Sequence, residues 1–201
     1  ARLSAEAAER ADIIIWPEVA VPLFLERNPG WRTWLMAQMR SWDKVVLFGG
    51  LKTGSEPSAG AEGSIHNGLF LFQPGQPGLQ FVGKKHLVPF GEYVPEWIPY
   101  LHTVVPNIGN FRPTRDQGVL LPVAAAAADW QSSFGALICY EALFPEEARQ
   151  RARSASVLVN VTMMHGTAHP LPVGSICRLR ACVLWKPGAG CCARPIPGYR
   201  R

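Results

Sequence analysis

The chain has 201 residues, of which 48% are hydrophobic and 17% charged, and its net charge is +5. This length suffices for one domain with a sizeable core, and the composition is that of a globular chain rather than a disordered one. The sequence contains no nucleic-acid motif, so a nucleic-acid partner is not expected. It also contains no apolar run long enough for a transmembrane helix and no visible signal peptide.

The chain begins with residues 1–10, which have the pattern of the end of an amphipathic helix with Leu3, Ala7 and Ala8 facing inward. An apolar run at residues 13–16 predicts a buried strand, and Glu18 lies just past its end. A carboxylate in this position can serve as a general base. The alternative is that Glu18 is a solvated loop acid.

Residues 31–83 alternate apolar runs with polar turns. We expect the tryptophans of a helix at residues 31–41 to lie in the core. Residues 53–64 and 73–78 are rich in polar and turn-forming residues and predict a loop and a hairpin turn. The predicted strands are residues 45–51, Ile65–Phe72 and residues 79–82.

Two lysines follow the last of these strands. Lys84 and Lys85 are adjacent, and either ammonium could stabilise a developing negative charge. The next ten residues read HLVPFGEYVP and include Glu92, which is either a second acid of a site or a solvated turn acid. An apolar segment follows at residues 96–105.

The most informative stretch is a buried apolar run at residues 134–138 that ends in Cys139, before a helix that we expect to extend through Arg153. A strand-to-helix turn exposes the sulfur, and neighbouring N–H groups can hold an oxyanion. The alternative for Cys139 is a small core residue. Glu141 could be an acid that favours the helix macrodipole. Residues 157–161 predict the next buried strand.

A glutamate, a lysine and a cysteine, each just past an apolar strand, form the set that thiol acyl-transfer chemistry requires. The glutamate takes the thiol proton, the lysine stabilises the tetrahedral intermediate, and the cysteine carries the acyl group.

These residues carry a specific resemblance. The order Trp16-Pro17-Glu18, then Lys84 ahead of the HLVPFGE segment, then Ile138-Cys139-Tyr140-Glu141 resembles the nitrilase (carbon–nitrogen hydrolase) superfamily. The HLVPFGEYVP segment is similar to the apolipoprotein N-acyltransferase family in particular. The resemblance covers residues 1–162 and implies an α/β fold, the nitrilase-type α-β-β-α sandwich. We expect this sandwich to be truncated at both ends, without the membrane helices that precede the catalytic domain in that family.

The resemblance also implies roles for individual residues. Its motif favours Lys84 over Lys85, and Glu92 is expected to position this lysine and close the site. Glu141 is expected to orient the nucleophile or the lysine, and residues 96–105 correspond to a mobile arm that meets lipid, with core packing as the alternative. The implied catalytic residues are Glu18, Lys84 and Cys139, and the supporting ones are Glu92, Tyr140 and Glu141.

The implied function is transfer of an acyl chain from a phospholipid, through a cysteine thioester, to the N-terminal lipidated cysteine of an apolipoprotein. It needs no metal or organic cofactor. The expected location is the bacterial inner (cytoplasmic) membrane, with the catalytic domain at the membrane surface facing the periplasm. The alternatives are a soluble amidase or nitrilase that uses water as acceptor, against which the HLVPFGEYVP segment argues, and an inactive truncated remnant.

After Thr162 the resemblance stops, and a tail rich in Pro, Gly, Cys and Arg follows. The family continues Asn-Asp-Ala-Trp, whereas this chain reads Met163-Met164-His165-Gly166. If the codons of these four residues are read with a shift of one base, every choice of codon gives Asp-Ala in the middle, and Asn before and Trp after are possible. The same shift at Trp185-Lys186 always gives a Glu, which the family also has. We therefore predict that residues 163–201 are an out-of-frame, poorly structured tail; a gene sequence incompatible with these codons would overturn this.

Overall fold

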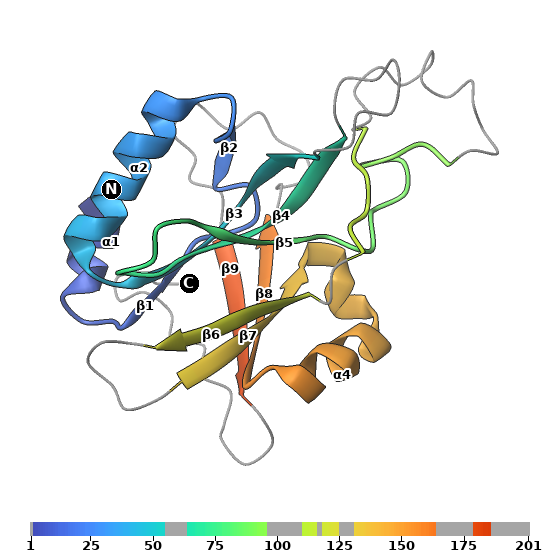
Figure 1. Ribbon diagram of the computed structural model, residues 1–201. Coiled ribbons are helices and arrows are strands. Elements are labelled where there is room, and N and C mark those ends of the chain that lie inside the picture. Colours follow the sequence, from blue (N-terminus) through green and yellow to red (C-terminus); the bar gives the residue numbers. More distant parts are fainter. Residues whose placement is uncertain are drawn as a thin grey trace, which may run out of the picture.

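The computed structural model describes residues 2–54, 64–95, 110–115, 118–124, 131–163 and 179–185. Within these residues two sheets lie between helices (Figure 1). The helices are α1 (Arg2–Ala8), α2 (Pro29–Trp42), the short 3-10 helix η1 (Cys139–Leu143) and α4 (Pro145–Ser154). The strands are β1 (Ile13–Ile15), β2 (Val21–Phe24), β3 (Val45–Thr53), β4 (Ile65–Phe72), β5 (Gln80–Gly83), β6 (Val119–Ala124), β7 (Gln131–Ile138), β8 (Val157–Met163) and β9 (Leu179–Trp185).

The first sheet has the order β1-β3-β4-β5, with β2 also paired to β3, and the second has the order β6-β7-β8-β9. Strands β1 and β2 run parallel to β3, while β3, β4 and β5 are antiparallel neighbours. In the second sheet β7 and β8 are parallel. A parallel pair needs a crossover connection, and η1 and α4 form it, so the turn at Cys139 begins this crossover.

Strand β3 shows how the layers are held together, because its side chains alternate between two apolar clusters. Val45 and Leu47 belong to the cluster between the two sheets, together with Phe134 and Ile138 of β7. Val46 and Phe48 belong to the cluster between the first sheet and α2, which also contains Leu35, Met39, Trp42, Phe70 and Phe72. The layer order helix, sheet, sheet, helix agrees with the predicted α/β sandwich (Figure 1).

The inward face predicted for the first helix is confirmed at Ala8, which packs against the cluster between the first sheet and α2, but not at Leu3 and Ala7, which are exposed. Leu3 is 71% exposed, and the buried residue of α1 is Ser4. The Ser4 hydroxyl accepts a hydrogen bond of 3.1 Å from the Trp16 indole N–H. This bond explains the rotation of α1, because the indole nitrogen of the half-buried Trp16 needs an acceptor.

The tryptophans at the start of α2 also differ from the prediction. Trp31 and Trp34 are 51% and 47% exposed and contact each other edge to face at 5.0 Å. The helix instead buries Leu35, Met39 and Trp42. These three follow the i, i+4, i+7 spacing of one helix face. Trp31, four residues before Leu35, lies on the same face but in the first turn of the helix, whereas Trp34 lies off this face.

Within the described residues, the tail that we predicted to be poorly structured contains the strand β9. β9 pairs antiparallel with β8, from Val157 opposite Trp185 to Met163 opposite Leu179. The edge of β8 offers backbone groups to any extended segment, so this pairing needs no particular side-chain pattern. The predicted boundary at residue 162 and the out-of-frame origin of the tail stay predictions. The segment at residues 96–105 lies outside the described residues, and no helix in the described part of the chain is long and apolar enough to cross a bilayer.

Candidate active site

Glu18 is held by the close approach of its loop to β3. The Trp16 N–H donates to the Leu47 carbonyl at 2.7 Å, and the Gly49 N–H donates to the Pro17 carbonyl at 3.0 Å. A Cβ at Gly49 would lie 2.4 Å from the Pro17 oxygen, so only glycine allows this contact. The loop therefore fixes the Glu18 carboxylate, which is 6% exposed, at the edge of the first sheet.

Lys84 lies buried between two carboxylates just past β5. Its Nζ is 3.4 Å from Glu18 Oε1 and 2.9 Å from Glu92 Oε1, and its side chain is 1% exposed. Burial lowers the pKa of Lys84, but the charges of Glu18 and Glu92 and the hydrogen bond to Glu92 outweigh it, so the net pKa is raised. The ammonium therefore stays charged at neutral pH.

The adjacent lysine lies elsewhere. Lys85 Nζ donates to Glu147 Oε1 at 2.7 Å, and its side chain is 38% exposed. The structure therefore brings Lys84, and not Lys85, into the cluster with Glu18, as the resemblance implied.

An asparagine that sequence reasoning missed joins the two carboxylates. Asn67 Nδ2 donates to Glu18 Oε1 at 2.9 Å and to Glu92 Oε1 at 3.1 Å. The other Glu92 oxygen accepts the Val88 N–H at 2.8 Å, which closes the loop after Lys84. The signal for Asn67 was an amide in β4 just before its apolar second half, where a buried polar group needs partners.

Cys139 stands at the turn from β7 into η1 and has a φ of 51°, in the left-handed region. A residue other than glycine there costs about 1–3 kcal/mol, and such strain is common where a side chain is presented for chemistry. Burial raises the pKa of the thiol, and so do the charge of Glu18 and a hydrogen bond to it. The charge of Lys84 and the Tyr140 N–H lower this pKa by less. The sulfur therefore holds its proton at neutral pH, next to a carboxylate that can accept it.

Glu141 is completely buried and acts on the backbone on both sides of the site. Its carboxylate accepts the N–H groups of Lys85 at 2.8 Å, His86 at 3.2 Å and Ile138 at 2.9 Å. It therefore joins the segment after Lys84 to the segment before Cys139. The prediction that Glu141 orients one of these two is thereby refined, because it holds the backbone next to both.

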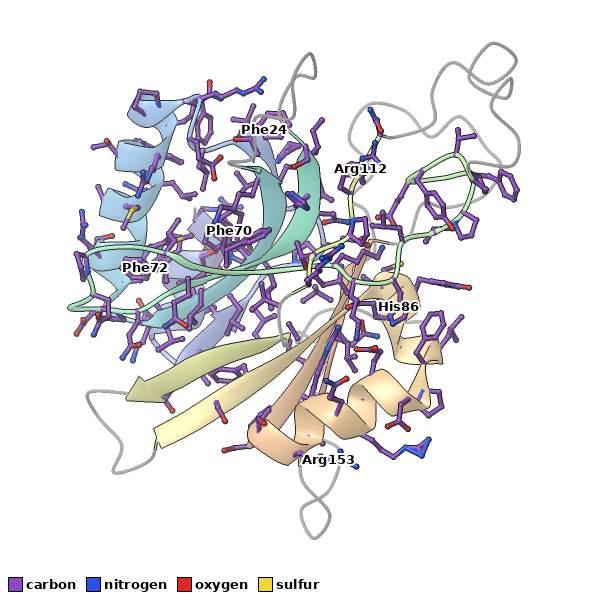
Figure 2. The ribbon with its side chains drawn as sticks, turned by 45° about the vertical axis from the view of Figure 1, so that its right-hand side comes forward. Phe24, Phe70, Phe72, His86, Arg112 and Arg153 are labelled. Carbon is purple, nitrogen blue, oxygen red and sulfur yellow. The ribbon has the colours of Figure 1, made fainter. Side chains whose placement is uncertain are left out.

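The surface beside the site is aromatic and cationic, and it includes Lys85 and Tyr140, the residues that follow Lys84 and Cys139. The His86 ring stacks on Phe144 at 4.2 Å, and Tyr140 meets Phe144 edge on at 5.1 Å. A cavity of about 840 Å³ opens here, and Figure 2 shows two of its lining residues, His86 beside the start of α4 and Arg112 above it. The described residues contain no group of three side chains suited to hold a metal ion.

Acid is expected to destabilise the fold through two glutamates of this region. Burial raises the pKa of Glu141, but the hydrogen bonds and charge of Arg151 outweigh it; at Glu147 the bonds from Lys85 and His86 do the same, so both pKa values lie below the ordinary 4.5. A depressed carboxyl pKa stabilises the fold above the unfolded-state pKa, and this contribution is lost as the pH falls through the folded-state value. The urea concentration at the midpoint of unfolding should therefore decrease as the pH is lowered below about 5.5. A midpoint that is flat from neutral pH to about pH 3.5 would contradict this.

Comparisons with known proteins show the family of this chain. The sequence model of the family described as carbon–nitrogen hydrolase matches residues 1–175, past the predicted boundary at residue 162. The chain is 31% identical to an apolipoprotein N-acyltransferase of Geobacter metallireducens, over 78% of this chain and 29% of that protein. It is 32% identical to the one of Agrobacterium fabrum, over 80% of this chain and 30% of that protein. The chain thus spans less than a third of the length of these relatives.

Two solved structures show the same fold. A carbon–nitrogen hydrolase of Helicobacter pylori G27 superposes with a TM-score of 0.53 at 14% identity, over 84% of this chain and 54% of that one. The NitN amidase of Nesterenkonia sp. AN1, a member of the nitrilase superfamily, gives a TM-score of 0.53 at 20% identity, over 83% of this chain and 59% of that one. The predicted nitrilase-type α/β fold is therefore confirmed.

Proposed function

We propose, from the premise that this chain belongs to the carbon–nitrogen hydrolase family, that it carries the catalytic residues of a lipoprotein N-acyltransferase. The observation that carries the proposal is the cluster of a carboxylate, a buried ammonium and a protonated thiol at Glu18, Lys84 and Cys139. The similarity to proteins named apolipoprotein N-acyltransferase supports the choice of substrate class.

In the first half of the proposed reaction Glu18 takes the proton of the Cys139 thiol. The thiolate then attacks the carbonyl carbon of a phospholipid acyl ester, and the oxyanion of the tetrahedral intermediate is held by the Lys84 ammonium and by N–H groups of the turn. The carbon–oxygen ester bond breaks, and Glu18 returns the proton to the leaving alcohol. The products are a lysophospholipid and an acyl thioester on Cys139.

In the second half the terminal amine of a lipidated cysteine attacks the thioester carbonyl. Glu18 accepts a proton from the amine, the carbon–sulfur bond breaks, and the proton passes to the Cys139 sulfur. The amide is formed and the thiol is restored. Lys84 stabilises the negative charge in both halves, so no metal or organic cofactor enters the proposal.

The cavity beside the site supports an amphiphilic substrate. Its rings, among them Tyr93, Phe111 and Tyr140, suit acyl or glycerol groups, and the Arg112 guanidinium suits an anionic head group. The location in the proposal is the one that the resemblance implies, the periplasmic surface of the bacterial inner membrane.

The first test measures the mass of the peptide that contains Cys139 after the chain has been exposed to phospholipid. The purified chain is incubated with phosphatidylethanolamine vesicles, and the peptide that contains Cys139 is isolated by mass spectrometry. We expect this peptide to gain one acyl chain, which hydroxylamine removes, and the Cys139→Ala chain to gain none.

Absence of the adduct on the folded chain would contradict the proposal. Hydrolysis of simple amides without an adduct from phospholipid would favour a soluble amidase, which would use the same three residues with water as acceptor. Absence of both activities would favour the interpretation that this chain is an inactive truncated remnant.

A further inference from the structure

A buried arginine on α4 links the elements that carry the site. Arg151 is 2% exposed and lies against two glycines of the second half of the chain. A Cβ at Gly118, where φ is +67°, would lie 2.4 Å from Arg151 Nε, and one at Gly135 would lie 3.1 Å from Arg151 Cβ. The space for this side chain therefore depends on the absence of side chains at both positions.

The guanidinium holds two glutamates at once. Arg151 donates to Glu141 at 2.9 and 3.0 Å, one bond to each carboxylate oxygen, and also to the Ala136 carbonyl on β7. Its second terminal nitrogen lies 3.6 Å from Glu147 Oε2. The fork of Arg151 thus sets the place of the Glu141 carboxylate with the geometry that only a planar guanidinium offers.

These two glutamates in turn hold the segment that follows Lys84. Glu141 accepts the N–H groups of Lys85 and His86, while Glu147 accepts from Lys85 Nζ at 2.7 Å and His86 Nε2 at 2.9 Å. Glu141 also accepts the N–H of Ile138, the residue before the nucleophile. A continuous path of hydrogen bonds therefore runs from Arg151 to the backbone beside both reacting groups.

We propose that Arg151 is a positioning residue that fixes the Lys84 segment relative to the Cys139 turn. The inference rests on the proposed function, since it concerns the geometry of that reaction. Without the fork, the buried Glu141 carboxylate would protonate or move, and the N–H groups of Lys85, His86 and Ile138 would lose their acceptor. Breaking a buried ion pair lowers stability whatever its role, so the positioning role is tested by the geometry of the site and not by the free energy of unfolding.

The test replaces Arg151 with lysine, which keeps the charge and removes the fork. We expect acylation of Cys139 to slow about 100-fold, as for a displacement of about 1 Å in a reacting group. The matched control is Arg149→Lys on the same helix, because Arg149 is 65% exposed and its ion pair with Glu146 is at the surface. This control should keep the parent rate.

A second readout does not depend on phospholipid. Iodoacetamide labelling of the Cys139 peptide is followed against pH for the parent, Arg151→Lys and Arg149→Lys chains, each shown to be folded by near-ultraviolet circular dichroism. Burial and Glu18 raise the pKa of the parent thiol. A displaced turn would relieve both effects, so the midpoint of the Arg151→Lys profile should move down toward that of a free cysteine.

The outcomes separate the two proposals. A shifted labelling profile for Arg151→Lys, with Arg149→Lys unchanged, supports the positioning role even if no chain is acylated, and in that case the proposed function fails alone. A folded Arg151→Lys chain with the parent profile and the parent acylation rate would overturn the positioning role. If Arg151→Lys does not fold, Glu147→Gln replaces it, and an unchanged profile in that variant overturns the path through the second glutamate.

Discussion

Replacing Lys84 with methionine is expected to slow formation of the Cys139 thioester by about 10²–10³-fold, the usual cost of removing one donor to an oxyanion. The side chain volume is nearly kept, but the ammonium that faces Glu18 and Glu92 is lost. Two buried carboxylates then share the Asn67 amide without a cation. The rate of acylation from phospholipid vesicles measures the effect.

The control for this prediction is Lys44→Met. Lys44 is half-buried and lies just before the start of β3 at Val45, whereas the Glu18 loop contacts the middle of this strand at Gly49. Acylation by this variant should match that of the parent chain. Parent-like acylation by the Lys84→Met variant would show that another group holds the oxyanion.

Replacing Glu141 with glutamine is expected to lower the free energy of unfolding by about 3–5 kcal/mol, the range for breaking a buried ion pair by removing one partner. The neutral amide leaves the buried Arg151 guanidinium with only the more distant carboxylate of Glu147, at 3.6 Å, as a counter-charge. It also turns one of the two accepting oxygens into a donor, which faces either the N–H groups of Lys85 and His86 or the N–H group of Ile138. Urea unfolding measures the loss as a lower midpoint at an unchanged slope.

A matched variant at the surface separates this effect from a general effect of removing charge. Glu146→Gln lies on α4 as well, but its side chain is 73% exposed and its ion pair with Arg149 is 3.6 Å long. Its stability should stay within about 0.5 kcal/mol of the parent. A Glu141→Gln chain as stable as Glu146→Gln would mean that the buried pair adds nothing to the fold.

The parts of the fold that follow from local pattern could be predicted. Strands β3 and β4 were expected from apolar runs, and Glu18, Lys84 and Cys139 were expected in one site because each follows a strand. The rotation of α1 could not be predicted, since it depends on a hydrogen bond from Trp16 to Ser4, twelve residues earlier.

The hydrogen bonds that join the site residues could not be predicted from the sequence either. Asn67 lies far along the chain from both Glu18 and Glu92, and only the register of β4 against its neighbours places its amide between them. Arg151 was expected only as part of a polar helix. Its burial depends on Gly118 and Gly135, two glycines whose importance shows only when the helix is packed on the second sheet.

The most direct test of the whole account is a chase of the acylated chain. The Cys139 thioester is formed from phosphatidylethanolamine vesicles, excess lipid is removed, and a diacylglyceryl-cysteine peptide with a free terminal amine is added. The account predicts that the Cys139 peptide loses its acyl mass while the acceptor gains the same mass as an amide. A thioester that gives only free fatty acid, at the same rate with and without the acceptor, would contradict N-acyl transfer and indicate a hydrolase.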